Sequence, residues 1–328
     1  MNYDEAKDKF TSLFNHDMSD NSMREFLQNI TLNEHTSVES IAAAAEVMRT
    51  FALPLPISEE LRKKSIDIVG TGGDKIGSFN ISSTVSILTA AAGCSVAKHG
   101  SRSITSKSGS ADMFEELGVR LDITVNQSAK LLEEAGFCFM FAQNHHPAMK
   151  FIVPVRKSIA DKTIFNILGP LTNPAGVEKS LLGVFDKAFV PKMAEALKIN
   201  GSKNALVVSS EEGMDEIGIS GVTYATHLKD GKTREFIIDP QEYGIKRVPL
   251  KAIIGGDAKD NAKILHDIFE FKATDAQRDI VLINAASALM VDGKVNDIQE
   301  GLEMAKYTIA TGKAKQKLNT IIEISNKL

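Results

Sequence analysis

The strongest constraint on the fold is a change in the hydrophobic pattern at Ile66. Before it, residues 4–64 carry apolar side chains at three- and four-residue spacing, which predicts helices. After it, short apolar runs alternate with helical segments, a pattern typical of βαβ units. We expect strands at residues 67–69, 95–97, 137–141, 180–185 and 205–209. The sequence therefore predicts an α/β fold with a central, mostly parallel sheet, preceded by a small all-helical part.

Capping residues and glycines predict where several elements begin and end. Thr36 and Glu39 form a capping-box pattern before the alanine-rich helix expected at 41–51, and a short helix is expected at 59–64. An Asp-Gly pair predicts the turn of a hairpin spanning 222–238. Other helices would end at glycines in the left-handed conformation, namely Gly93, Gly118 and Gly136. From residue 257 onward the pattern is helical again.

Residues 147–174 break the alternation, because helical spacing runs across Pro154 and is followed by a proline-rich loop. We expect this segment to return to the N-terminal helices. The predicted division is a discontinuous helical domain, residues 1–64 joined by about 148–176, and an α/β domain of residues 65–147 and 177–328. The two crossings would act as a hinge, and an interface of this kind is a favoured place for a pocket.

Composition excludes several classes of protein. Hydrophobic residues make up 43% of the 328 residues and charged residues 24%, values of a folded globular protein. The formal net charge of −4 gives no global attraction to nucleic acid. Cys94 and Cys138 lack zinc-ligand spacing, so we expect buried thiols. The N-terminus has no signal-like apolar segment and residues 81–97 are too short and polar to span a bilayer, which predicts a cytoplasmic protein.

Residues 67–83 form a candidate anion site. A predicted strand runs into Gly70-Thr71-Gly72-Gly73, and a helix begins after Asn80. Glycine-loop amides and a helix N-terminus both favour phosphate. The dinucleotide pattern GxGxxG is absent, and Ser78 stands where a Walker loop requires lysine. The alternative is a plain turn.

A second polar segment, residues 97–112, follows the next predicted strand. It mixes the basic side chains of Lys98, His99, Arg102 and Lys107 with several hydroxyls. On its own it could be a solvated loop. Two such segments at successive strand ends favour one polyanionic ligand bound between them.

Asp215 and Glu216 are adjacent carboxylates after a predicted strand. Magnesium prefers one or two carboxylates together with substrate phosphates and water. The pair is therefore a candidate Mg²⁺ site, although a solvated acidic loop is the alternative. The histidines at 145 and 146 do not share a helix face and are not expected to bind metal, whereas Arg156 could clamp a carboxylate.

The order and spacing of these motifs resemble those of the anthranilate phosphoribosyltransferase family between Asp67 and Glu216. The matching segments read GTGGD, FNIS, KHG-R-SKSGSAD, HPAMK, PVR, TIFNILGPLTNPAG and GMDEI. The resemblance implies transfer of a phosphoribosyl group from 5-phosphoribosyl 1-diphosphate to anthranilate, in tryptophan biosynthesis, with Mg²⁺ as cofactor. It also implies a homodimer whose subunits have a small helical and a large α/β domain.

The resemblance further implies roles for individual residues. Donor-binding positions are Gly70, Gly73, Asp74, Ser78, Asn80, Ile81, Ser82, Ser83, Lys98, His99, Gly100, Ser101, Arg102, Ser103, Ile104, Thr105, Ser106 and Ser110. Magnesium positions are Ser82, Asp215 and Glu216. Anthranilate positions are Gly70, His99, Ser101, His146, Arg156 and Pro170. Lys98, Asp215 and Glu216 would act by stabilising the leaving group, with no dedicated general base.

Four positions depart from the family pattern. Ser101 replaces the usual asparagine, Ser78 and Ser83 replace threonine, and Lys162 replaces a frequent arginine near the expected hinge. A serine at 101 shortens the acceptor side of the site by an amide group.

Two other functions remain open from the sequence. A pyrimidine nucleoside phosphorylase would share the architecture, but the paired acids count against it because a diphosphate needs a metal more than orthophosphate does. A catalytically silent nucleic-acid-binding relative is disfavoured by the negative net charge and by the complete set of donor motifs.

Overall fold

The computed structural model describes residues 1–103 and 107–328. Its centre is a seven-stranded sheet with the order β3-β2-β1-β4-β5-β6-β7. The strands are β1 (Ser65–Gly70), β2 (Ser95–Gly100), β3 (Phe137–Phe141), β4 (Lys179–Gly183), β5 (Asn204–Ser210), β6 (Thr223–Lys229) and β7 (Lys232–Ile238). The first five pair in parallel, and β6 and β7 add an antiparallel hairpin. The predicted mostly parallel α/β sheet is therefore confirmed.

Helices surround this sheet. The α-helices are α1 (Tyr3–Phe14), α2 (Asp20–Asn29), α3 (Val38–Thr50), α4 (Glu59–Lys64), α5 (Ile81–Ala91), α6 (Ser110–Glu116), α7 (Val125–Ala135), α8 (Ala142–His145), α9 (Met149–Lys157), α10 (Phe165–Leu168), α11 (Val190–Ile199), α12 (Ala258–Phe269), α13 (Asp275–Asp292), α14 (Ile298–Ala310) and α15 (Lys313–Lys327). Short 3₁₀ turns are η1 (Gly169–Leu171), η2 (Lys187–Phe189), η3 (Pro240–Tyr243) and η4 (Leu250–Ile253). No helix in the described parts of the chain is long and apolar enough to cross a membrane.

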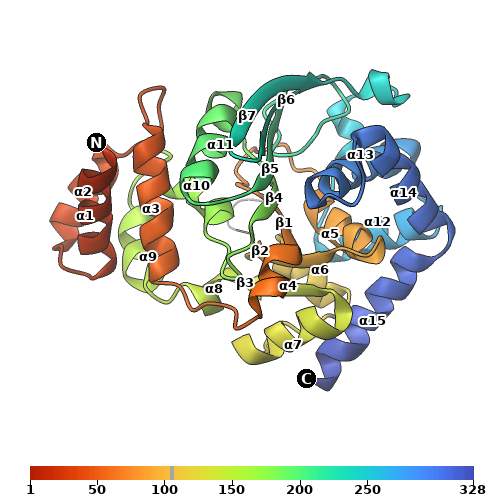
Figure 1. Cartoon of the computed structure of the whole chain (residues 1–328), viewed down its shortest axis with the longest axis horizontal. Helices are drawn as coiled ribbons and strands as arrows, with labels where there is room; N and C mark the ends of the chain where they lie inside the picture. The colour runs from red at the N-terminus through yellow and green to blue at the C-terminus, as the bar shows by residue number, and fades with distance from the viewer. Residues whose placement is uncertain (104–106) are drawn as a thin grey trace.

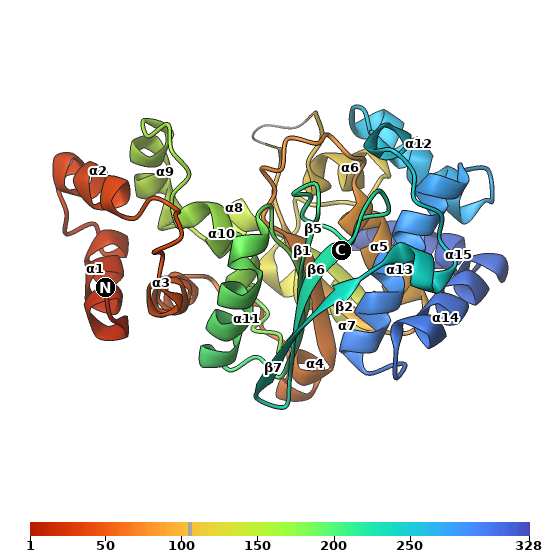
Figure 2. The same cartoon turned by 90° about the horizontal axis from the view of Figure 1, so that it is seen from above.

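Each face of the sheet carries its own apolar cluster, because successive strand residues point to opposite faces. On β1, Ile66 and Ile68 pack with α5, α13 and α15, whereas Val69 packs with the cluster of α1, α3 and α11. Figures 1 and 2 show the two groups of helices on opposite sides of the sheet. The sheet is thus the layer that joins the two clusters.

The segment after α8 lies against the N-terminal helices. Helix α9 contacts α1 and α2, and α10 contacts α3. Backbone bonds also tie the segment down, since Leu32 N donates to Lys162 O at 2.8 Å and Ile164 N to Ile30 O at 3.1 Å. The division of the chain into two domains remains a prediction.

The predicted elements are present, but several of their ends differ: β1, β2 and β4 have bounds that depart by one to three residues from those expected. Gly93, Gly118 and Gly136 all have positive φ, as a left-handed helix end requires. The predicted cap of α3 is wrong by one residue, because Ser37 is the N-cap and its hydroxyl accepts from Ser40 N. Thr36 cannot serve there because its hydroxyl accepts from Asn33 N in the preceding turn.

Candidate active site

The candidate active site lies where the parallel strands end, at the carboxyl edge of the sheet. The loop after β5 reaches the loop after β1, because Gly72 N donates to Asp215 Oδ2 at 2.7 Å. It also reaches the first turn of α5, where Ser82 N donates to Glu216 Oε1 at 3.1 Å. Three segments that are far apart in the sequence therefore meet, as expected for neighbouring parallel strands.

The glycine loop between β1 and α5 has the backbone of a tight, amide-rich turn. Gly72, Gly73 and Gly77 have φ values of 67°, 76° and 76°, a region that favours glycine. Asp74 Oδ1 accepts from Ile76 N at 3.1 Å and fixes the middle of the loop. The positive φ values and the Asp74 side chain thus shape the middle of the loop, and the Gly72 amide lies against Asp215.

Two glycines at the strand ends make room for Asp215. A Cβ on Gly70 would lie 2.2 Å from Asp215 Oδ2, and one on Gly183 would lie 1.7 Å from the carbonyl oxygen of Asp215. Side chains at these two positions would push the carboxylate away from the loop. Gly70 thus has a packing role beside the binding role implied by the resemblance.

The paired acids are held in an electrostatically unfavourable position. Burial, with the nearby Asp74 carboxylate, raises the pKa of Asp215 to about 6. Burial and the Asp215 charge raise the pKa of Glu216 well above its ordinary value, and Lys98 opposes this shift. A divalent cation would relieve the repulsion between these groups.

These side chains would supply some of the ligands of a Mg²⁺ ion, and the substrate would supply others. Within residues 1–103 and 107–328 no cluster of three His, Cys, Asp or Glu side chains could hold a metal by itself. Two carboxylates and the Ser82 hydroxyl are a partial set of hard oxygen ligands, which Mg²⁺ completes with water and phosphate oxygens.

Lys98 is a fully buried cation beside this set. Its Nζ donates to Ile68 O at 2.5 Å and to Ser82 Oγ at 3.2 Å. Burial lowers the pKa of Lys98, whereas the negative charges of Asp67, Glu216 and Asp215 raise it. These bonds aim one positive charge at the start of α5.

The first turn of α5 offers amides and hydroxyls on the same side. Ile81 is its first residue, and the buried Ser83 hydroxyl has no hydrogen-bond partner among the described residues. Asn80 does not cap the helix, because its Oδ1 accepts from Ser108 Oγ at 3.1 Å and from Asn261 Nδ2 at 2.8 Å. Sequence reasoning missed Asn261, which lies 181 residues away and matches no motif.

In the segment after β2, Arg102 and Ser103 contact acidic side chains of α6. Arg102 forms ion pairs with Asp112 and Glu115 at 2.9 and 2.5 Å, which raise its pKa. Ser101 Oγ donates to Arg102 O at 3.0 Å, and Ser103 N donates to Asp112 Oδ2 at 3.3 Å.

The other predicted donor positions flank these loops. Ser78 forms a bridge with Ile254, Ser110 begins α6, and a Cβ on Gly100 would meet the Phe139 ring at 2.7 Å. Gly73 lies in the glycine loop. Ile104, Thr105 and Ser106 lie outside the described residues.

Three of the predicted acceptor positions, His99, His146 and Pro170, lie close together on the face of the sheet that carries α1, α3 and α11. The rings of His99 and His146 lie 5.1 Å apart, and His99 Nδ1 is 3.3 Å from Gly169 O, next to the buried Pro170. Burial lowers the pKa of His99 to about 3 and of His146 to about 4, so both are neutral at pH 7. The Nε2 atoms of both have no partner among the described residues.

Arg156 comes from α9, on the side of the N-terminal helices. Its guanidinium lies 5.8 Å from the centroid of the Phe165 ring, and burial lowers its pKa. No carboxylate in the described part of the chain forms an ion pair with it. It is therefore a half-buried cation whose charge is available to an acidic ligand.

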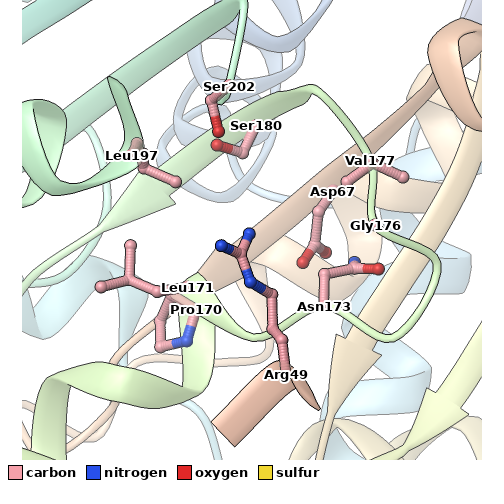
Figure 3. Close-up of a pocket in the computed structure, with 10 residues that line it drawn as sticks. All are labelled: Arg49, Asp67, Pro170, Leu171, Asn173, Gly176, Val177, Ser180, Leu197 and Ser202. Carbon is pink, nitrogen blue, oxygen red and sulfur yellow. The ribbon is translucent and has the colours of Figure 1, made fainter. Parts of the chain in front are cut away.

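A separate cavity of about 20 Å³ lies deeper on the same face, between α3, β1 and β4. Figure 3 shows the Arg49 guanidinium pointing into it, with Asp67 and Ser180 around it. Asp67 Oδ2 and Ser180 Oγ have no partner within the described residues. The cavity has room for about one water molecule, too little for either substrate.

Comparison with known proteins agrees with this arrangement. Residues 62–315 match the family described as glycosyl transferase family, a/b domain. The anthranilate phosphoribosyltransferases of Xanthobacter autotrophicus and Methanobrevibacter smithii are 43% and 41% identical to the chain. Each alignment covers 99% of this chain, with 93% and 96% of the respective relatives.

Solved structures show the same likeness. The crystal structure of anthranilate phosphoribosyltransferase from Thermus thermophilus superposes with a TM-score of 0.91 at 35% identity, covering 99% of this chain and 96% of that one. The Saccharomyces cerevisiae enzyme in complex with PRPP and Mg gives 0.86 at 27% identity, covering 97% and 91%. On this identity, coverage and shared fold, the chain belongs to the anthranilate phosphoribosyltransferase family.

Proposed function

We propose that this chain transfers the phosphoribosyl group of 5-phosphoribosyl 1-diphosphate to anthranilate, giving N-(5-phosphoribosyl)anthranilate and diphosphate in tryptophan biosynthesis. The observation that carries the proposal is the set of contacts made by Asp215 and Glu216. These carboxylates bond to the glycine loop and to the start of α5, and Lys98 lies beside them. A yeast relative has been solved in complex with PRPP and Mg, which supports the same donor here.

We assign donor binding to the glycine loop, the start of α5 and the loop after β2, and metal binding to Ser82, Asp215 and Glu216. Mg²⁺ would neutralise charge on the diphosphate and so make it a better leaving group. His99, His146, Arg156 and Pro170 would hold anthranilate, with Arg156 facing its carboxylate. Ser101 would lie between the two substrates.

The reaction replaces one bond at the anomeric carbon. The lone pair of the anthranilate amine forms the N–C bond, the C–O bond breaks with its electron pair leaving on diphosphate, and the nitrogen then loses one proton to water. The amine is neutral at pH 7, so it needs no strong base. The Lys98 ammonium stabilises charge that develops on the leaving group, and the neutral histidines place no positive charge beside the amine. Catalysis rests on positioning and on stabilisation of the leaving group.

Anthranilate fluorescence tests the proposal directly. The purified protein is mixed with anthranilate and phosphoribosyl diphosphate, with Mg²⁺ or with a chelator. We expect fluorescence to fall only with Mg²⁺ and donor together. A protein that instead cleaves pyrimidine nucleosides with orthophosphate, without need of Mg²⁺, would contradict the assignment.

We further propose a homodimer located in the cytoplasm, with the domain division expected from the sequence. Two buried free thiols suit a reducing compartment. Exposed apolar side chains on the helical part, Leu53 and Phe151, are available for subunit contact. Sedimentation equilibrium tests the dimer, and a monomer at micromolar concentration would refute it.

A further inference from the structure

Lys162 occupies a junction between the N-terminal helices and the glycine loop. Its backbone belongs to the helical side, because its carbonyl accepts from Leu32 N at 2.8 Å. The neighbouring Ile164 N donates to Ile30 O at 3.1 Å. The main chain at 162 is thus fixed to the segment that follows α2.

The side chain of Lys162 instead contacts the loops that follow two strands of the sheet. Lys162 Nζ donates to Gly73 O at 3.0 Å and lies 3.2 Å from the centroid of the Phe185 ring. Gly73 follows β1 and Phe185 follows β4, and Phe185 N donates to Thr71 Oγ1 at 3.2 Å. One lysine therefore contacts both loops that extend these neighbouring strands.

The glycine loop needs such support from outside. Two consecutive glycines of the loop have positive φ, and glycine loses more conformational freedom on ordering than any other residue. Asp215 accepts a hydrogen bond from Gly72 N, and Lys162 donates one to the carbonyl oxygen of the next residue, Gly73. Burial and the nearby Lys75 lower the pKa of Lys162, whereas the charges of Asp186, Asp74 and Asp215 oppose this shift.

We propose that Lys162 is a positioning residue that fixes the glycine loop for the donor diphosphate and couples the loop to the docking of the N-terminal helices. The inference rests on the proposed function, because it takes phosphoribosyl diphosphate as the ligand of this loop. A loop held in its binding conformation loses less entropy when the ligand arrives, so Lys162 contributes to donor affinity. Because the lysine touches no predicted acceptor position, anthranilate affinity stays the same.

Three substitutions separate charge from shape. Lys162→Met keeps the length and removes the ammonium, Lys162→Gln keeps a donor without charge, and Lys162→Arg keeps both. Lys157→Met is the matched control, an exposed lysine at the end of α9. Calorimetry with phosphoribosyl diphosphate and Mg²⁺ gives the donor affinity, and the fluorescence assay gives KM and kcat.

We expect Lys162→Met to bind the donor about 10-fold more weakly and to raise its KM by a similar factor, with kcat and anthranilate KM within about 2-fold. Lys162→Arg restores donor affinity to within about 3-fold of the native chain, Lys162→Gln is intermediate, and Lys157→Met is unchanged. Thermal melts confirm that each variant is folded.

Donor affinity equal to the native value in Lys162→Met would overturn the inference. So would a loss in Lys162→Arg as large as in Lys162→Met. The two proposals fail in different ways. A native chain that binds the donor without consuming anthranilate refutes the function, whereas full transfer with no effect of Lys162→Met refutes only the role of the lysine.

Discussion

At the scale of single residues, two neighbours on β2 serve opposite faces of the sheet. Lys98 points toward α5, where its Nζ contacts Ser82 Oγ, and His99 points toward Gly169 on the helical face. The alternation of side chains along a strand forces this separation. The dipeptide thus supplies a cation to the face that carries α5 and a neutral ring to the opposite face. Under the proposed function, these would be the donor and the acceptor sides of the site.

Neutralising the paired acids should remove activity without loss of stability. In the double variant Asp215→Asn, Glu216→Gln, we expect kcat/KM to fall at least about 100-fold, because the metal loses its charged ligands. Both carboxylates have raised pKa values in the folded chain, so their ionised forms oppose folding at pH 7. The melting temperature should therefore be equal to or above that of the native chain.

Activity is measured by anthranilate fluorescence and stability by circular dichroism in the presence of a chelator. Glu211→Gln, an exposed acid in the same loop, is the control for a general change of charge. Full turnover in the double variant would show that these acids do not hold the metal.

The buried Asp67 carboxylate should make stability depend on pH. Burial raises its pKa from 3.8 to about 6, so between these pH values the folded chain keeps a proton that the unfolded chain has lost. The free energy of unfolding therefore decreases as pH rises through this window. Asp67→Asn stays neutral, and we expect it to gain about 1–3 kcal/mol relative to the native chain between pH 4 and 7.

Urea denaturation of both chains across this range measures the difference. His99 and His146, whose lowered pKa values act in the opposite direction, are present in both chains and cancel to first order. Asp122→Asn is the control: Arg120 lowers the pKa of this exposed acid below 3.8, so the variant should be no more stable than the native chain, and its difference from the native chain should not change with pH between 4 and 7. A difference that is flat with pH would mean that Asp67 titrates normally.

At the scale of elements, local signals in the sequence located nearly every strand and turn. The hairpin turn is one example, since Asp230 and Gly231 both have positive φ, as the Asp-Gly pair predicted. The cap at Thr36 was wrong because two adjacent hydroxyls compete, and only the fold decides which one faces the helix. Short-range patterns therefore identify elements better than they identify their first residues.

Residues of the candidate site could be predicted from the sequence only where they belong to a recognisable motif. Asp215 and Glu216 could be placed near the phosphate loops because parallel strands end at one edge. Asn261 could not, since it contacts Asn80 across 181 residues. Lys162 is notable in the sequence only as a replacement for arginine near the expected hinge, and its contact with Gly73 across 89 residues was not predicted. A single lysine or asparagine outside a motif gives no signal of such a contact.

The end of β4 should not tolerate a side chain. Gly183→Ala places a Cβ 1.7 Å from the backbone oxygen of Asp215, so the loop after β5 must move. We expect a loss of about 2–4 kcal/mol in the free energy of unfolding, together with loss of Mg²⁺-dependent activity. Gly169→Ala is the stability control, because a Cβ there meets nothing within 4 Å and the backbone φ is negative.

Urea denaturation gives the two free energies. Equal stability of both variants would mean that the loop after β5 yields easily and that Gly183 does not fix the position of Asp215.

At the scale of the whole molecule, the two apolar clusters share the central sheet. Val69, Leu182 and Val207 belong to the cluster that also contains α1, α3 and α11. Their strand neighbours Ile68 and Leu206 belong to the cluster on the opposite face. The N-terminal helices therefore share an apolar cluster with side chains of the strands. A motion of these helices relative to the sheet would disturb that packing.

This shared sheet predicts a single cooperative unfolding transition, although the sequence suggests two domains. Leu13→Ala in α1 and Leu318→Ala in α15 each remove a buried side chain from one of the two clusters. Each should lower the free energy of unfolding by about 2–5 kcal/mol and shift the same calorimetric peak. Two peaks, with Leu13→Ala shifting one and Leu318→Ala the other, would show that the helical part unfolds as an independent domain.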